Sequence, residues 1–88
     1  MENKLRLCVV TQEETVLDSY VSAVNLPTAF GSVGILSGHA AMVCAVTKGV
    51  LRCTYADGRE ERVLLGAGIA EVADNEVTVL VADARRAE

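Results

Sequence analysis

The sequence predicts an all-β protein, an antiparallel sandwich or barrel built from short strands, and three observations predict it. The apolar residues are mostly β-formers, with 14 Val and 2 Ile against 9 Leu. Apolar and polar residues alternate with a period of two in several short runs. Glycine and other turn-forming residues separate these runs every 8–12 residues or so, which is the spacing of antiparallel β-proteins. A helical period of useful length is missing before Asp83.

The N-terminal part predicts three strands. In the first, Leu5, Leu7 and Val9 alternate with residues 6, 8 and 10, which are Arg, Cys and Val, so one face should be buried. A polar turn at residues 11–14 follows. The second and third expected strands cover residues 15–17 and 20–26. Pro27 should end the third strand, because proline has no N–H to donate to a ladder.

The central part is less regular. Residues 28–39 contain Gly31, Gly34 and Gly38, a density that indicates turns with positive φ or close backbone approach. Residues 40–46 are apolar almost throughout, so we expect a strand that is buried on both faces or lies at an interface.

Two hairpins are expected in the C-terminal part. Residues 50–55 and 61–65 flank Ala56-Asp57-Gly58, and residues 69–72 and 77–82 flank Asp74-Asn75. Residues 83–88 have a helix-forming composition but are too few to hold a helix alone.

Length and charge limit the function classes. With 88 residues, the chain predicts one domain, residues 1–88. Its net charge of −4 argues against nucleic acid and against an anionic lipid surface as partners. Its apolar runs are far shorter than the roughly 20 residues of a membrane helix, and its start does not resemble a signal peptide. We therefore expect no direct membrane insertion.

Catalytic and metal-binding patterns are weak. His39 is the single histidine, and its nearest candidate nucleophiles, Ser37 and Cys44, stand in no known catalytic frame. We expect its imidazole to hydrogen-bond to backbone or to meet a partner. The spacing of Cys8, His39, Cys44 and Cys53 fits no common zinc pattern. Three cysteines without a C-x-x-C pair are typical of buried reduced thiols in a cytosolic setting. We expect no catalytic residue, no metal and no cofactor.

Three blocks of sequence resemble the epsilon subunit of F-type ATP synthases, which is called delta in mitochondria. Residues 23–40, AVNLPTAFGSVGILSGHA, are similar to the family pattern V-x-L-P-G-x-x-G-E-F-G-V-L-P-G-H-A-P-L. Residues 48–52, KGVLR, resemble K-P-G-x-L-R-I, and residues 68–83, GIAEVADNEVTVLVAD, resemble G-F-V-E-V-x-x-N-x-V-T-V-L-A-D. The blocks keep their order and spacing, and the resemblance covers essentially the whole chain. Thr28 and Ser32 depart from the family, which usually has a glycine and an acidic residue there.

This resemblance implies a flattened antiparallel β-sandwich of about ten short strands. It also implies a non-catalytic rotor subunit in the central stalk, which docks the gamma subunit to the c-ring and couples ion translocation to ATP synthesis or hydrolysis. The loop implied to face the c-ring is Thr28, Ala29, Phe30, Gly31 and Ser32. The residues implied to face gamma are Thr11, His39, Ala40, Met42 and Cys44, with Thr11 near the same rim as His39.

The implied partners are gamma and the c-ring, within a complex that includes alpha and beta subunits. The implied location is the cytoplasmic face of the bacterial plasma membrane, as a peripheral protein. Family members usually carry a C-terminal hairpin of two helices, which we expect to be absent here, in a short form that binds no nucleotide. Two alternatives stay open: a free-standing β-sandwich that binds or regulates and shares only the fold, and a small enzyme that uses His39 and Cys44.

Overall fold

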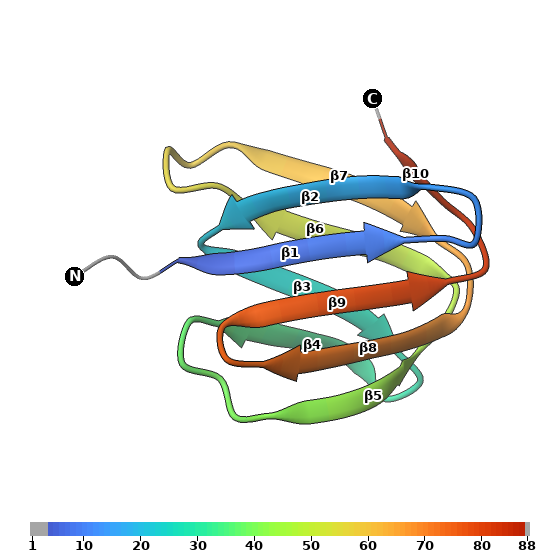
Figure 1. The fold of residues 1–88 in the computed structure, drawn as a ribbon, viewed down its shortest axis with the longest axis horizontal. Coiled ribbons are helices and arrows are strands. Elements are labelled where there is room, and N and C mark those ends of the chain that lie inside the picture. Colours follow the sequence, from blue (N-terminus) through green and yellow to red (C-terminus); the bar gives the residue numbers. More distant parts are fainter. Residues whose placement is uncertain (1–3, 88) are drawn as a thin grey trace.

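Two five-stranded sheets packed face to face make up the whole of the described chain (Figure 1). The computed structural model describes residues 4–87. Sheet A has the order β2-β1-β9-β8-β5, and sheet B has the order β10-β7-β6-β3-β4. The strands of sheet A are β1 (Leu5–Val10), β2 (Thr15–Val21), β5 (Met42–Val46), β8 (Gly68–Ala73) and β9 (Glu76–Val81). The strands of sheet B are β3 (Ala23–Thr28), β4 (Gly31–Leu36), β6 (Gly49–Thr54), β7 (Glu60–Leu65) and β10 (Ala84–Arg86).

The expected all-β sandwich is confirmed, and it is flattened, with extents of 35 × 28 × 23 Å. Neighbouring strands pair antiparallel except β1 and β9, which run parallel. No helix in residues 4–87 has the length and apolar character needed to cross a lipid bilayer.

The core is a single apolar layer between the two sheets. Most strands supply alternate residues to it, such as Leu5, Leu7 and Val9 of β1, whose side chains have no exposed surface. Within the described residues no polar or charged side chain is buried in it. The period-two pattern of β1 thus predicted its buried face correctly.

The boundary between the second and third strands was predicted wrongly. One strand continues from Thr15 to Val21, and the next begins at Ala23. At Ser22 the chain leaves sheet A and enters sheet B. There the backbone N–H and the hydroxyl of Ser22 both donate to the carbonyl oxygen of Thr54, at 2.7 and 2.9 Å. This long-range anchor, with no local turn signal, sets the break.

Pro27 does not end the third strand, and the irregular segment after it contains a strand, β4. Pro27 lies opposite Ser32 in the β3–β4 pair, while the ladder from β3 to β6 stops at Asn25. The missing N–H of Pro27 therefore removes no ladder bond. Past the end of this ladder the proline ring packs over Gly49. A Cβ added to Gly49 would lie only 2.9 Å from the Pro27 Cβ, so the contact requires glycine.

Both expected hairpins are present. Asp74 and Asn75, with φ of 52° and 59°, form the tight turn between β8 and β9, in which two positive φ values match the twist of the strands. Gly58, with φ of 91°, turns the chain between β6 and β7.

The C-terminal end adds a short strand to sheet B. Residues 84–86, whose composition favours a helix, pair instead with β7 as β10. Pairing with an existing edge fixes their conformation, whereas so short a helix would lack support.

Candidate docking surfaces

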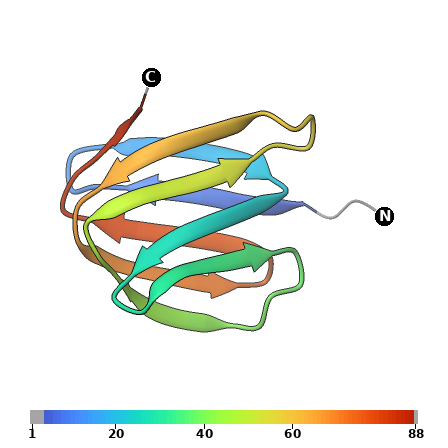
Figure 2. The ribbon, with the colours of Figure 1, turned by 180° about the vertical axis from the view of Figure 1, so that it is seen from behind.

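The two ends of the sandwich hold the residues that the sequence singled out. One end, here called the Phe30 end, carries the β1–β2 and β3–β4 turns. The other, the His39 end, carries the β4–β5 connection and the β6–β7 and β8–β9 hairpins (Figures 1 and 2). Strand β5 runs between the two ends along one edge of sheet A.

The β3–β4 turn is held by the side chain of Thr28. Its hydroxyl donates to the carbonyl oxygen of Gly31 at 2.6 Å and accepts the backbone N–H of Phe30 at 3.2 Å. Gly31 has φ of 106°, a conformation that favours glycine. Thr28 thus fixes the turn at the position where the family usually has glycine.

Phe30 is the most exposed large apolar side chain of the described residues, with an exposure of 100%. Ala29, Gly31 and Ser32 beside it are also exposed, and Thr28 is half-buried. Phe30 thus stands at the tip of the turn, between the paired ends of β3 and β4. Covering such a ring would be worth roughly 1.5–3 kcal/mol, so the turn can anchor a contact with another surface.

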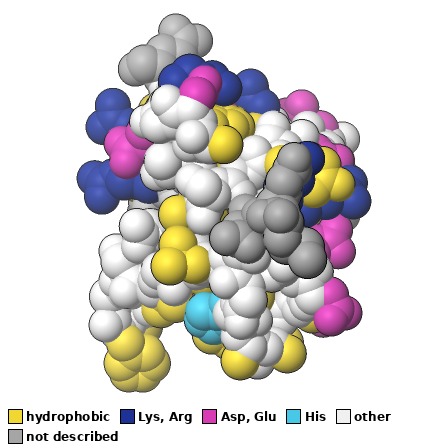
Figure 3. Space-filling model, turned by 90° about the vertical axis from the view of Figure 1, so that its left-hand side faces the viewer, with side chains coloured by type: hydrophobic (Ala, Val, Ile, Leu, Met, Phe, Trp, Pro, Cys, Tyr) yellow, Lys and Arg dark blue, Asp and Glu magenta, His cyan; other side chains and the backbone are white. Residues whose placement is uncertain are grey.

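At the His39 end, hydrogen bonds to backbone fix the loop around the histidine. The side-chain oxygen of Asn75 accepts the Gly38 N–H at 2.7 Å, which joins this loop to the β8–β9 turn. His39 donates its backbone N–H to Leu36, and its Nδ1 lies 2.7 Å from the carbonyl oxygen of Ala40. Figure 3 looks at this end, where charged side chains of both signs lie along the top and sides and the histidine lies lower, among apolar patches.

The imidazole therefore hydrogen-bonds to backbone, which is one of the two roles expected for it from the sequence. In the described part of the chain no hydrogen bond joins it to a hydroxyl or thiol, so the geometry activates no nucleophile. Residues 4–87 also contain no group of three or more His, Cys, Asp or Glu placed to hold a metal ion.

Strand β5 is an open edge. Of the two alternatives expected for residues 40–46, burial on both faces is not met within this chain, and a place at an interface stays a prediction. Met42 and Cys44 are half-buried and pack against the core, on the same face as the buried Val46. Val43 is 68% exposed, and Ala45 beside it is exposed too. Ala40, just before the strand, is exposed.

A partner that covers β5 from outside would therefore meet Val43 and Ala45, which the sequence analysis did not single out. Val43 and Ala45 alternate with the residues that face the core, so the sequence would have identified them if the buried position of Val46 had been known. Val43 begins an apolar area on the outer face of sheet A. Across the sheet, Ala45 lies opposite Ile69, and Ile69 lies opposite Leu80. Both Ile69 and Leu80 are about half exposed.

Thr11 lies at the Phe30 end, so the expectation that it shares a rim with His39 is wrong. It caps the β1–β2 turn: its N–H and hydroxyl donate to the Glu14 carbonyl at 2.9 and 3.3 Å. Strand β1 begins beside Asn75, the residue that holds the His39 loop, and runs its full length before reaching Thr11.

All three cysteines are free thiols. Cys53 is buried, whereas Cys8 and Cys44 are only half-buried, so the expectation of buried thiols is right for one of the three. Burial raises the pKa of the Cys53 and Cys8 thiols. Both therefore stay protonated at neutral pH, which argues against either as a nucleophile.

Taken together, these features define a β-sandwich that offers an exposed aromatic turn and an open apolar edge. The chain belongs to the family of the ATP synthase delta/epsilon chain, β-sandwich domain, whose model matches residues 4–87.

Curated relatives carry the same family name. The chain is 44% identical over 84 residues to the ATP synthase epsilon chain of a Synechococcus species, covering 96% of this chain and 61% of that protein. It is 42% identical to the chloroplastic epsilon chain of Piper cenocladum, covering 93% and 61%. To the epsilon chain of Carboxydothermus hydrogenoformans it is 39% identical, covering 100% and 65%. The chain thus spans about three fifths of the length of these relatives.

Solved structures show the same fold. A chain in the cryo-EM structure of the Euglena gracilis mitochondrial ATP synthase, OSCP/F1/c-ring, superposes with a TM-score of 0.90 at 26% identity, covering 98% of this chain and 55% of that one. A chain in the central stalk/c-ring structure of the Tetrahymena thermophila enzyme gives a TM-score of 0.75 at 19% identity, covering 94% and 66%. At that lower identity the likeness concerns the fold alone.

Proposed function

We propose that this chain is the β-sandwich part of a rotor subunit in the central stalk of an F-type ATP synthase. There it docks gamma to the c-ring and couples ion translocation to ATP synthesis or hydrolysis. The observation that carries the proposal is the family match across residues 4–87, with relatives named ATP synthase epsilon chain at about two fifths identity. The superposition on a chain of the Euglena F1/c-ring assembly supports it.

The proposed c-ring contact is the β3–β4 turn, Thr28 to Ser32. A fully exposed phenylalanine on a turn that side-chain hydrogen bonds hold rigid suits a contact that must transmit force. The ring loses little conformational freedom when it is covered, because the turn beneath it is already ordered.

The proposed gamma contact follows the open edge of sheet A. It includes His39, Ala40 and the exposed parts of Met42 and Cys44. We add Val43, because its side chain points outwards. Thr11 reaches this surface only if gamma extends along β5 to the Phe30 end. A long contact of this kind would cover the unpaired edge of β5, which is otherwise prone to pair with other chains.

The proposed role is non-catalytic and needs no cofactor. The subunit would sit at the membrane as a peripheral protein, on the cytoplasmic face in a bacterium. Its contribution is mechanical, since the chemistry of ATP belongs to other subunits of such a complex.

The first test is co-purification. Tagged chain, expressed with the other subunits from its own source, should carry gamma, the alpha and beta subunits and the c-ring through two columns. Recovery of the chain alone, with all the other subunits present and assembled, would overturn the proposal and favour a free-standing β-sandwich module.

A second test uses Cys44. In the isolated chain a maleimide should react with its half-exposed thiol, and in the gamma-bound complex the reaction should slow by about tenfold or more, because a partner on β5 excludes the reagent. Cys8, on the outer face of sheet A, serves as the internal reference. Equal rates for Cys44 in the free and bound states would place gamma elsewhere.

A further inference from the structure

Four cations gather on the outer face of sheet B, which is not the face that the proposed gamma contact uses. Buried Leu51 and Cys53 on β6, and Val63 and Leu65 on β7, set which residues point outwards. The outward cations are Arg52 on β6, Arg62 on β7, Arg85 on β10 and Lys48 just before β6. We call this set the arginine face; Figure 2 looks onto sheet B.

None of the four has an ion pair or a side-chain hydrogen bond with another described residue, although the other arginines do. Arg6 pairs with Asp18, Arg59 with Asp57 and Arg86 with Glu61. Two carboxylates lie at the margins of the arginine face, Glu60 on the next row of β7 and Asp83 before β10. A chain of net charge −4 therefore concentrates half of its eight cations in one unpaired cluster.

The arrangement works against the fold. Arg52 and Arg62 stand directly opposite each other in the β6–β7 pair, and like charges in that position destabilise a sheet. No ion pair among residues 4–87 compensates the charges of Arg52 and Arg62, so both guanidinium groups are available to a bound partner.

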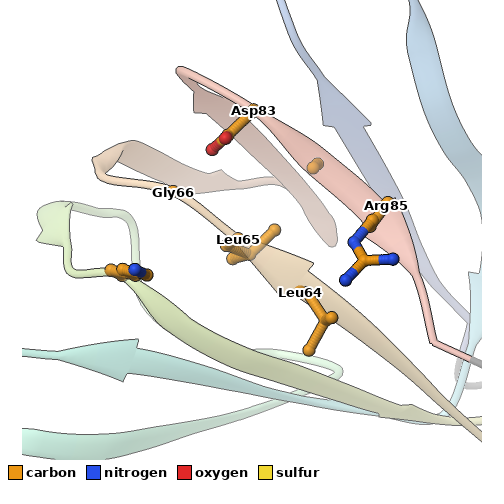
Figure 4. A pocket seen from close by; sticks show the side chains of 7 residues that line it. Leu64, Leu65, Gly66, Asp83 and Arg85 are labelled. Carbon is orange, nitrogen blue, oxygen red and sulfur yellow. The ribbon is translucent and has the colours of Figure 1, made fainter.

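An apolar strip lies next to the charges. Val50 is opposite Leu64, and Leu64 is opposite Arg85, so the three residues form one row across the sheet with the apolar pair beside Arg85. Leu64, Arg85 and Lys48 line one hollow of about 370 Å³, in which Figure 4 shows the Arg85 and Leu64 side chains next to each other. Arginine beside an apolar anchor is the composition that protein interfaces favour.

We propose that the arginine face docks an acidic segment of a partner protein, with carboxylates on Arg52 and Arg62 and an apolar side chain over Val50 and Leu64. A guanidinium binds a carboxylate through two parallel hydrogen bonds. Adjacent strands lie about 4.8 Å apart, and side chains at i and i+4 of a helix lie about 5–6 Å apart. Two helical carboxylates one turn apart therefore match the two arginines. A lipid surface or a nucleic acid fits less well, because each extends beyond the four cations and would meet the acidic rest of the chain, whereas a single helix covers the arginine face alone. This inference does not depend on the proposed function.

The probe is a synthetic helical peptide of about 18 residues, long enough to form in water. It carries Glu pairs at i and i+4 with Leu between them, and a matched peptide carries Gln in place of Glu. Binding to the isolated chain is measured by fluorescence anisotropy in low and in high salt. The Glu peptide should bind with a Kd below about 1 mM in low salt, at least tenfold tighter than the Gln peptide, and salt should weaken it.

The variant R52Q/R62Q should lose about tenfold or more of this affinity. The matched control R6Q/R59Q removes the same two charges from other faces and should bind as the natural chain does. Thermal unfolding of R52Q/R62Q should occur at the same or a higher temperature, since a repulsive pair is removed.

Several results would overturn the proposal. These are no binding of the Glu peptide in low salt, equal losses in both double variants, or a lower unfolding temperature for R52Q/R62Q than for R6Q/R59Q. Capture of the chain by phosphatidylserine vesicles that depends on Arg52 and Arg62 would assign the face to a membrane. Self-association that depends on them would assign it to a second copy.

Discussion

At the scale of single residues, the described chain keeps polar side chains out of its core and joins them by hydrogen bonds and ion pairs at the margins of the sheets. The contacts around Tyr55 are an example. Its hydroxyl donates to a carboxylate oxygen of Glu61 at 2.6 Å, and the other oxygen of Glu61 lies 3.2 Å from Nε of Arg86. The guanidinium of Arg59 lies over the Tyr55 ring at 4.4 Å from its centre. This cluster closes one margin of the sandwich and fastens β10 to β7.

Tyr55→Phe should make stability less sensitive to alkaline pH. Burial, and then the hydrogen bond to Glu61, raise the pKa of Tyr55 to about 12 in the folded chain, above its unperturbed value of about 10. A raised folded pKa means that the stabilisation is complete below about pH 10 and disappears as pH rises through about 12. At pH 7 the variant should be less stable by about 1 kcal/mol, the loss of one hydrogen bond.

The free energy of unfolding of both proteins, measured in urea from pH 7 to pH 12, checks this. The two values should converge above pH 10, since only the natural chain loses the protonated Tyr55. Tyr20→Phe is the control, because Tyr20 is 61% exposed and should leave the profile unchanged. Parallel curves for the natural chain and Tyr55→Phe up to pH 12 would contradict the prediction.

At the scale of elements, local signals were predictable from the sequence and long-range ones were not. The turns at Asp57-Gly58 and Asp74-Asn75 are properties of two adjacent residues, so the sequence was enough. The break at Ser22 depends on Thr54, 32 residues away, and β10 forms because the edge of β7 is available. The site followed the same rule: Phe30 was predictable as a turn tip, whereas Val43 and the arginine face required the pairing of strands.

Phe30→Asp should separate ring attachment from folding, if the proposed function holds. The side chain touches nothing that the fold needs, because it is fully exposed. The variant should therefore stay folded and bound to gamma. It should weaken attachment to the c-ring by about 10-fold to 150-fold, the equivalent of the roughly 1.5–3 kcal/mol of burying one phenylalanine.

ATP synthesis in reconstituted vesicles should then fall more than hydrolysis by the detached catalytic part. Tyr20→Asp is the matched control, since Tyr20 is 61% exposed on β2, at the edge of sheet A opposite β5. If synthesis and hydrolysis fall together in Phe30→Asp, or the protein unfolds, the turn does not serve as the ring contact.

At the scale of the whole molecule, the described chain is one cooperative unit, because each sheet depends on the other for its core. The buried residues come from both sheets in one cluster, and β1 and β9, from opposite ends of the chain, are neighbours in sheet A. The surface, in contrast, is divided. An exposed aromatic turn, an open apolar edge and an unpaired basic face lie on different sides. These three surfaces are compatible with a small core, because none of them places a polar side chain inside it.

Cys53 should report this cooperativity through its chemistry. It lies in β6, between β3 and β7, with no exposed surface, so a reagent can reach it only when the sheets separate. In a chain with Cys8→Ala and Cys44→Ala, a maleimide should label Cys53 at least about a thousandfold more slowly than in urea, which reflects a free energy of unfolding near 5 kcal/mol.

In the companion chain with Cys8→Ala and Cys53→Val, the half-exposed Cys44 should react far faster, because its thiol is reached when the edge strand β5 opens or without any opening. The rate at Cys53 should rise with urea in step with global unfolding followed by circular dichroism. Labelling of Cys53 as fast as that of Cys44, or independent of urea below the transition, would mean that sheet B opens by itself and that the sandwich is not a single unit.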